Sequence, residues 1–292
     1  MLRLSYAAME LEDWQLGART YRSYCSMEQV TYSDVTDNFI SLTSYLFFQD
    51  SFEAWNNLAR CYVKLEQKER AWRVLQEAVR CDFENWKVWD NIMVIATDIG
   101  VFDDVVRSYN RILDIKKTHV DKEVLGILVK AVLADLEDSA GKGSARLRPD
   151  LLKLLARLTV AVPREAAPWR LYGELLSAGA ADQEGVVRGA QCYQRALAAT
   201  TGHRGWERLR ESCGEAVSCG LALLEVVGRV EGGQQLQLAN SARLSLKSVV
   251  KQVESGQAEV ETGQLPGMVE AELAPLREAL ELLNDRIAHL KT

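Results

Sequence analysis

The side chains that could carry out catalysis or hold a metal ion are few and far apart in this sequence. The three histidines, His119, His203 and His289, are too dispersed to form a catalytic triad or a metal cluster with other residues. No CxxC pair occurs among the six cysteines, which lie in apolar helical patterns: Cys25, Cys61, Cys81, Cys192, Cys213 and Cys219. We therefore expect reduced thiols packed as small apolar side chains, no cofactor and no enzymatic activity.

The composition also excludes several partners. A chain of 292 residues with 48% hydrophobic and 26% charged residues is typical of an ordinary globular protein. Its net charge of -6, without a long basic run, does not favour a nucleic-acid-binding face. No apolar run reaches the roughly 18–20 residues of a membrane span, and the first residues contain no signal-peptide core. We expect a cytoplasmic protein, with the nucleus as a second compartment, and neither nucleic acid nor membrane as a partner.

Residues 53–83 contain most of one helix–turn–helix repeat, and the rest of the chain is organised around them. The first half puts large side chains on one helical face, at spacings of 3 and 4: Trp55, Leu58 and Tyr62. In the second half, small residues flank a large one: Ala71, Leu75 and Ala78. This is the pattern of a tetratricopeptide repeat, whose period is about 34 residues. Phe83 stands where that repeat has its proline.

A second copy follows at the same period. The matching residues, each 34 positions further on, are Trp89, Ile92, Val105 and Tyr109. Four matches at one period predict an all-α tetratricopeptide-repeat solenoid of antiparallel helix pairs. We assign residues 1–116 to these repeats, and residues 117–292 to degenerate helical repeats followed by C-terminal capping helices.

The remaining helices of the chain are predicted from weaker patterns. Helices are expected near residues 103–115, 124–136, 149–160, 206–227, 236–253 and 268–290. A degenerate repeat is expected from one helix with Trp169, Gly173 and Leu176, and a second with Gly189, Tyr193 and Ala196. The last helix has one apolar stripe: Leu276, Leu280, Leu283 and Ile287. That stripe favours a helix that caps the array, and the alternative is a coiled-coil partner.

A surplus of 20 residues interrupts the first part. Gly17 and Tyr21 fit the second helix of a repeat, but they lie 54 residues before their counterparts Ala71 and Leu75, where 34 are expected. Removing residues 30–49 restores the period. The segment begins with Val, whose codons start with GT, and ends with Phe-Phe-Gln, which allows a T-rich run and a terminal AG. It therefore fits a non-native insertion, an intron read in frame, and the alternative is a genuine loop between repeats.

Deleting residues 30–49 is expected to leave the amount of helix unchanged and to raise the melting temperature or the solubility. The segment is rich in aromatic and β-branched residues, which conflict with the helical pattern on both sides. Circular dichroism and thermal melts of the two forms would check this. Unfolding of the shortened protein would contradict it.

Several stretches resemble the tetratricopeptide repeat protein 27 family. They are RLSYAAMELEDWQLGARTYRSY, FEAWNNLARCYVKLEQKERAWRVLQEAVRCDFENWKVWDN, the WRLYGELL segment and the helical tail. The resemblance implies an intracellular, non-enzymatic adaptor linked to chaperone-assisted assembly of large complexes, including the spliceosomal U5 particle. It also implies that the chain corresponds to the C-terminal part of such a protein, without the family's long N-terminal helical region.

Repeat arrays of this kind bind partners through the face lined by the first helix of each repeat. On the 34-residue frame, the candidate groove residues are Asn56, Asn57, Arg60, Lys64, Lys87, Asp90, Asn91 and Asp98. We expect them to bind other proteins, and the alternative is a structural solenoid segment with no ligand groove. The carboxylate clamp of chaperone-binding repeats matches only at Asn57 and Lys87, because Asn91, Leu2 and Tyr6 replace its other donors.

Overall fold

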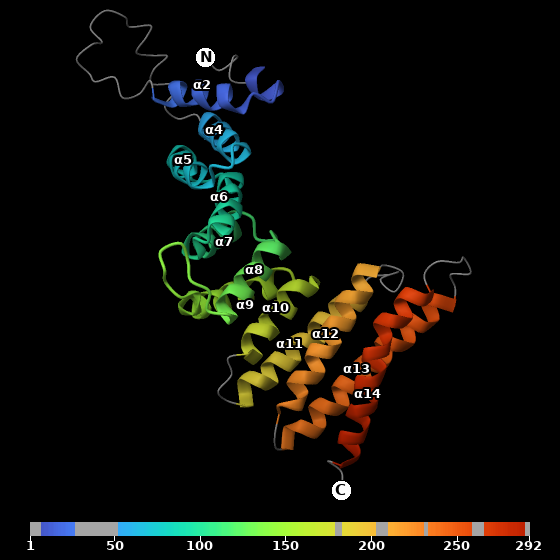
Figure 1. Cartoon of the computed structure of the whole chain (residues 1–292). Helices are drawn as coiled ribbons and strands as arrows, with labels where there is room; N and C mark the ends of the chain where they lie inside the picture. The colour runs from blue at the N-terminus through green and yellow to red at the C-terminus, as the bar shows by residue number, and fades with distance from the viewer. Residues whose placement is uncertain are drawn as a thin grey trace, which may run out of the picture. The chain divides into compact units, whose positions relative to one another are not determined.

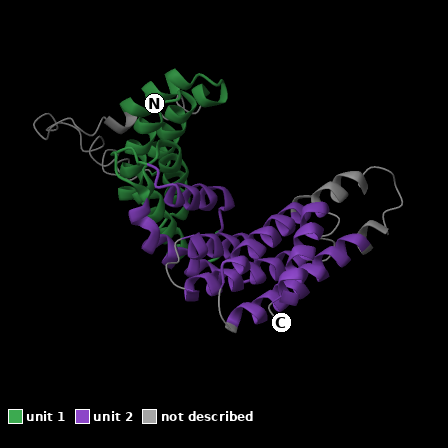
Figure 2. Ribbon diagram, turned by 60° about the horizontal axis from the view of Figure 1, so that its bottom comes forward, with its two compact units in different colours: residues 1–119, 137–144 green, residues 120–136, 145–292 purple. Residues whose placement is uncertain are grey.

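A computed structural model describes residues 7–26, 52–178, 183–202, 210–230, 233–258 and 266–289. The predicted insertion, residues 30–49, lies outside these ranges, as do Leu2 and Tyr6. The chain forms two compact units (Figure 2), and each is described by itself. Unit 1 comprises residues 1–119 and 137–144, and unit 2 comprises residues 120–136 and 145–292.

Unit 1 is a row of helices in which each packs against the next (Figure 1). The helices are α2 (Trp14–Ser26), α4 (Phe52–Lys64), α5 (Lys68–Cys81), α6 (Trp86–Ile99) and α7 (Phe102–Ile115). The pairs α4–α5 and α6–α7 are the two predicted repeats. Gly100 ends α6 with a left-handed φ of 74°, a conformation that glycine adopts without steric cost. Helix α7 agrees with the predicted range to within one residue.

The core of unit 1 follows the repeat pattern. Ala71, Leu75 and Ala78 have no exposed surface, and their counterparts Val105 and Tyr109 are equally buried. The small residues let the paired helices approach closely, and the large ones fill the space between neighbouring pairs. The prediction of a buried second helix in each repeat is therefore confirmed.

Helix α2 packs on α4 as the second helix of a repeat should. Tyr21 is fully buried, and a Cβ added at Gly17 would lie 3.1 Å from the Cys61 sulfur. Arg22 Nη2 donates a hydrogen bond to the Tyr62 hydroxyl at 2.6 Å and ties the two helices together. The assignment of Gly17 and Tyr21 to a second helix is confirmed.

The helical spacing of the tryptophans predicts that they, Trp55 included, lie in the core, and those of the described ranges depart from this prediction. Two are buried, and four are only half-buried: Trp14, Trp55, Trp72 and Trp86. The prediction that Trp55 is buried is therefore wrong. Indole rings are large and have a polar edge, so they tend to sit at the border of a core. Trp72 uses this edge to donate to Asp104 Oδ2 at 3.1 Å, and Lys116 Nζ lies 4.0 Å from the centre of the Trp86 ring.

Unit 2 is also helical. Its helices are α8 (Lys122–Leu133), α9 (Arg148–Ala161), α10 (Ala166–Ala178), α11 (Gln183–Thr201), α12 (Arg210–Gly228), α13 (Gly233–Ala258) and α14 (Pro266–His289), with the 3-10 turn η2 (Ser144–Leu147) before α9. The predicted helix over residues 124–136 is too long, because Ala134 caps α8 and Asp135 takes a positive φ of 46°. Within the described ranges the only β-type pairing is a single bridge between Glu137 and Gly143, so the all-α prediction is confirmed.

Helices α10 and α11 form the predicted degenerate repeat. Gly189, Tyr193 and Ala196 face the core from α11 and are buried. The two helices come close enough that a Cβ at Gly173 would lie 3.0 Å from the Gly189 carbonyl oxygen. Here glycines replace the small alanines of the first repeat and permit a still closer approach of the two backbones.

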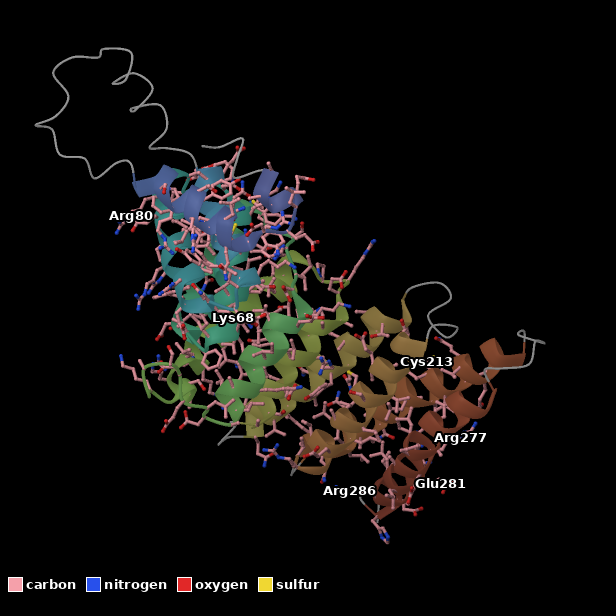
Figure 3. All side chains as sticks on the ribbon, turned by 45° about the horizontal axis from the view of Figure 1, so that its top comes forward. Lys68, Arg80, Cys213, Arg277, Glu281 and Arg286 are labelled. Carbon is pink, nitrogen blue, oxygen red and sulfur yellow. The ribbon has the colours of Figure 1, made fainter. Side chains whose placement is uncertain are left out.

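The last three helices enclose one apolar cluster. The stripe of α14 contributes Leu276, Leu280, Leu283 and Ile287, all buried within unit 2. At the edges, Arg277 donates to Glu254 of α13 and Arg286 donates to the Gly228 carbonyl at the end of α12 (Figure 3). The stripe is therefore covered by this chain's own helices, which supports the capping interpretation over a coiled-coil partner.

Candidate functional site

The candidate groove residues lie on α4 and α6, the first helices of the two repeats. Asn91 Nδ2 of α6 donates to Asn56 Oδ1 of α4 at 2.6 Å. Both amides are half-buried, and this bond holds the two first helices side by side. Two of the candidate residues thus contact each other within unit 1.

Three other candidates also have partners within unit 1. Asn57 Nδ2 donates to the Tyr21 hydroxyl at 3.3 Å. Asp98 pairs with Lys68 of α5, with 3.0 Å between carboxylate oxygen and ammonium nitrogen. Asp90 Oδ1 lies 3.2 Å from His119 Nε2, an ion-pair distance without the alignment of a hydrogen bond. The acidic candidates are therefore each close to a basic group.

The basic candidates remain exposed: Arg60 and Lys64 on α4, and Lys87 on α6. Lys64 Nζ lies 5.8 Å from the centre of the Trp14 ring, a distance suited to a weak cation–π contact. No ion pair joins any of these three cations to an acid in the described part of the chain. The exposed charge on the α4–α6 face is therefore mainly positive, although the whole chain has a net charge of -6.

Three of the five positions of a carboxylate clamp lie in the described ranges. Asn57 is bonded to Tyr21, Asn91 is bonded to Asn56, and only Lys87 projects into solvent. The positions of Leu2 and Tyr6 lie outside the described residues.

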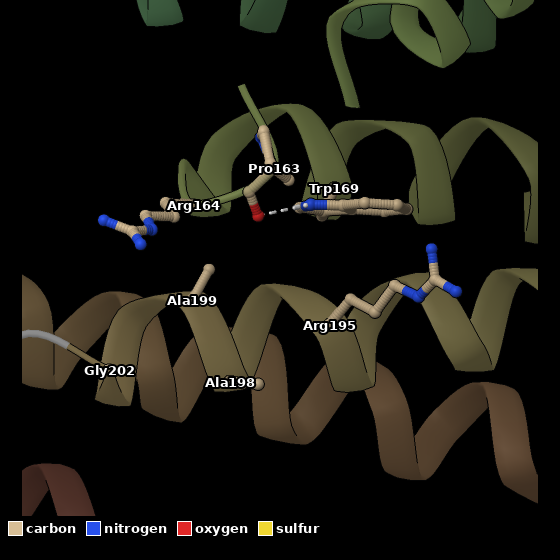
Figure 4. Close-up of a pocket in the computed structure, with 7 residues that line it drawn as sticks. All are labelled: Pro163, Arg164, Trp169, Arg195, Ala198, Ala199 and Gly202. Atoms are coloured by element: carbon tan, nitrogen blue, oxygen red, sulfur yellow. Dashed lines mark hydrogen bonds between the residues drawn. The ribbon is translucent and has the colours of Figure 1, made fainter. Parts of the chain in front are cut away.

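A cavity in unit 2 was not anticipated from the sequence. It has a volume of about 710 Å³ and is lined by residues of the α9–α10 turn, α10 and α11: Pro163, Arg164, Trp169, Arg195, Ala198, Ala199 and Gly202. Trp169 Nε1 donates to the Pro163 carbonyl oxygen at 3.0 Å, as the dashed line in Figure 4 shows. The Arg195 guanidinium lies 4.7 Å from the centre of the Trp169 ring. One wall of the cavity is thus an aromatic ring already in contact with a cation.

Four of the cysteines in the described ranges are buried thiols. Cys61, Cys192, Cys213 and Cys219 are buried and none is in a disulfide. Burial raises the pKa of Cys192 to about 11 and that of Cys219 to about 12, so both stay protonated at neutral pH. The expectation of thiols packed as apolar side chains is confirmed for these four residues.

The described residues contain neither a metal-binding cluster nor a membrane-spanning helix. No group of three or more His, Cys, Asp or Glu side chains is placed to hold a metal ion. None of the described helices combines the length and apolar character needed to cross a lipid bilayer.

Comparisons with known proteins point to helical repeats. No protein-family model matches the chain. Tetratricopeptide repeat-containing protein trd-1 of Caenorhabditis elegans is 27% identical over 267 residues, which is 85% of this chain and 34% of that protein. TPR repeat-containing protein C19B12.01 of Schizosaccharomyces pombe is 26% identical over 68% of this chain and 25% of its own length. The chain therefore spans about a third or less of these relatives.

One more sequence relative and one solved structure are similar to this chain. The tetratricopeptide repeat protein 27 homolog of Dictyostelium discoideum is 24% identical over 61% of this chain and 20% of its own. Among solved structures, a tetratricopeptide repeat protein from Parabacteroides merdae aligns with 97% of this chain and 96% of its own, at 10% identity and a TM-score of 0.43. The chain thus has two 34-residue helical repeats, and its sequence is similar to tetratricopeptide repeat proteins, including a tetratricopeptide repeat protein 27 homolog.

Proposed function

We propose that this chain is a non-enzymatic protein-interaction scaffold that binds an acidic segment of a partner through the α4–α6 face. The observation that carries the proposal is the exposure of Arg60, Lys64 and Lys87 on adjacent first helices. Of the neighbouring acids, Asp98 is paired with Lys68, and Asp90 lies 3.2 Å from His119 Nε2. A positive face on a negatively charged chain favours a negatively charged partner.

In the finer form of the proposal, the protein is a co-chaperone-like adaptor for the assembly of large complexes such as the U5 spliceosomal particle. It would act in the cytoplasm, and the nucleus is a second compartment. Support for this comes from the resemblance to the tetratricopeptide repeat protein 27 family. The second candidate is a structural solenoid segment that has no ligand groove of its own. The bonds of Asn56, Asn57 and Asn91 within unit 1 favour that candidate, because they serve packing alone.

Replacing Arg60 and Lys87 together by glutamate is expected to reduce the recovery of U5 particle proteins and chaperones about tenfold in affinity purifications. Both side chains are exposed, so the fold should be retained. Quantitative mass spectrometry of the purified material, with circular dichroism of the variant, would measure both effects.

The matched control reverses two exposed cations elsewhere in unit 1, Arg73 on α5 and Lys117 after α7. It changes the net charge by the same amount and should leave recovery at the wild-type level. Equal recovery with all three proteins would favour the structural alternative. Equal loss with both variants would show a dependence on net charge rather than on the α4–α6 face.

A further inference from the structure

The cavity in unit 2 lies at the same place in its repeat as a set of contacts around Phe83 and Trp89 in unit 1. Trp89 Nε1 donates to the Phe83 carbonyl at 3.0 Å, just as Trp169 donates to Pro163. Trp169 follows Trp89 by 80 residues, and Pro163 follows Phe83 by the same number. Trp89 and Trp169 therefore anchor the turn before each first helix in the same way.

The second helices correspond as well, with an offset of 84 residues. Tyr109 of α7 and Tyr193 of α11 are both buried at this offset. Two residues later, Arg111 and Arg195 each place a guanidinium over an aromatic ring, Arg111 at 4.2 Å from the centre of Phe83. The four additional residues of the second repeat fall between its two helices, so the two arginines occupy the same position, although Arg111 lies over Phe83 and Arg195 over Trp169.

The two sites differ in charge. In unit 1, Glu84 follows Phe83 and its carboxylate lies 2.6 Å from Arg111 Nη2. In unit 2, the residue at this position is Arg164, and proline replaces the phenylalanine ring. The described residues provide no acidic partner for Arg164 or Arg195. Unit 2 therefore has a cavity with two exposed arginines where unit 1 has its own apolar–acidic pair.

We infer that this cavity binds an acidic segment of a partner protein, with a carboxylate at Arg195 and an apolar side chain beside it. Phe83 and Glu84 indicate what such a ligand would look like, because at the equivalent position of unit 1 Phe83 packs on Trp89 and Glu84 pairs with Arg111. Arg195 would pair with the carboxylate as Arg111 pairs with Glu84. The site is separate from the α4–α6 face and does not depend on it.

The walls favour a peptide over a small inorganic anion. Pro163, Ala198 and Ala199 give the cavity an apolar surface, and its volume of about 710 Å³ is within the usual range for organic ligands. Figure 4 places Arg164 and Arg195 toward opposite ends, with Ala199 between them. Two arginines in the lining fit a segment with more than one carboxylate.

The test uses the full chain and a fluorescein-labelled peptide that contains one phenylalanine followed by glutamates, between glycine–serine flanks. Fluorescence anisotropy should show binding that weakens about tenfold when glutamine replaces the glutamates. Arg195→Glu should weaken binding by at least the same factor. Arg229→Glu, an exposed cation at the end of α12, is the matched control and should bind the peptide as the wild type does.

Arg164→Glu separates this proposal from a general charge effect. It restores the acid that unit 1 has at Glu84, so it should pair with Arg195 and close the cavity from within. We expect it to lose peptide binding and to raise the melting temperature, whereas Arg164→Gln should lose less binding and gain no stability.

Three results would overturn the inference: equal affinity for the glutamate and glutamine peptides, unchanged binding by Arg195→Glu, or tighter binding of a single-stranded oligonucleotide that displaces the peptide. In a chain that already carries Arg60→Glu and Lys87→Glu, and so lacks the positive α4–α6 face, Arg195→Glu should still weaken peptide binding about tenfold. Failure at the α4–α6 face and failure at this cavity are therefore distinguishable.

Discussion

Replacing Leu75 by alanine is expected to lower the free energy of unfolding of unit 1 by about 2–5 kcal/mol. Leu75 is fully buried on α5, which packs against both α4 and α6. The substitution removes apolar surface from the core and leaves a cavity that these helices can close only in part. In a repeat array, each pair is stabilised mainly by its neighbours, so the loss should weaken both adjoining interfaces. Urea denaturation followed by circular dichroism would measure it.

The same substitution at Leu11 is the matched control. Leu11 is also in unit 1, but 80% of its surface is exposed. Its replacement by alanine should change the free energy of unfolding by no more than about 0.5 kcal/mol. A similar loss of unfolding free energy in both variants would mean that burial at the repeat position does not determine the stability of unit 1, contrary to the fold described above.

The core positions were predictable because helical periodicity determines which side chains share a face. Leu75, Tyr109 and Tyr193 recur at one position of successive or degenerate repeats, and all three are buried. The glycines Gly173 and Gly189 were predictable for the same reason, since close helix pairs require small residues at fixed places. Here the local pattern and the tertiary packing impose the same requirement.

The polar face was harder to predict, because its state depends on neighbouring helices. Periodicity places Asn56 and Asn91 on first helices, but it cannot indicate that their amides bond to each other. In the same way, Asp98 is engaged by Lys68 from a different helix. Which polar residues remain available to a partner is decided by these contacts across helices.

A reversal of charge in the sequence indicates the position of the unit 2 cavity. Glu84 and Arg164 occupy the same position of their repeats, a reversal of charge beside an arginine that both repeats keep. To recognise it, the second helices must be aligned with four additional residues in the turn, so that Arg195 corresponds to Arg111. The sequence also cannot show that replacing Phe83 by proline leaves the space open.

Replacing Gly173 by valine is expected to lower the free energy of unfolding of unit 2 by about 2–3 kcal/mol. A Cβ at this position would lie 3.0 Å from the Gly189 carbonyl oxygen and 3.2 Å from the Cys192 Cβ. The first of these is a backbone atom, which cannot move aside without shifting α11. Overpacking of this kind separates the two helices and exposes part of the core around Tyr193. Chemical denaturation would report the loss of stability, and increased amide hydrogen exchange in α10 and α11 would locate it.

Gly214→Ala separates this steric effect from the general effect of removing a helical glycine. Gly214 lies in α12 of the same unit, and an added Cβ would meet nothing within 4 Å. Since alanine favours helix over glycine by roughly 0.5–1 kcal/mol, this variant should be more stable than the wild type. The two substitutions should thus have opposite signs. Stabilisation by Gly173→Val would show that α10 and α11 do not approach each other as closely as these distances require.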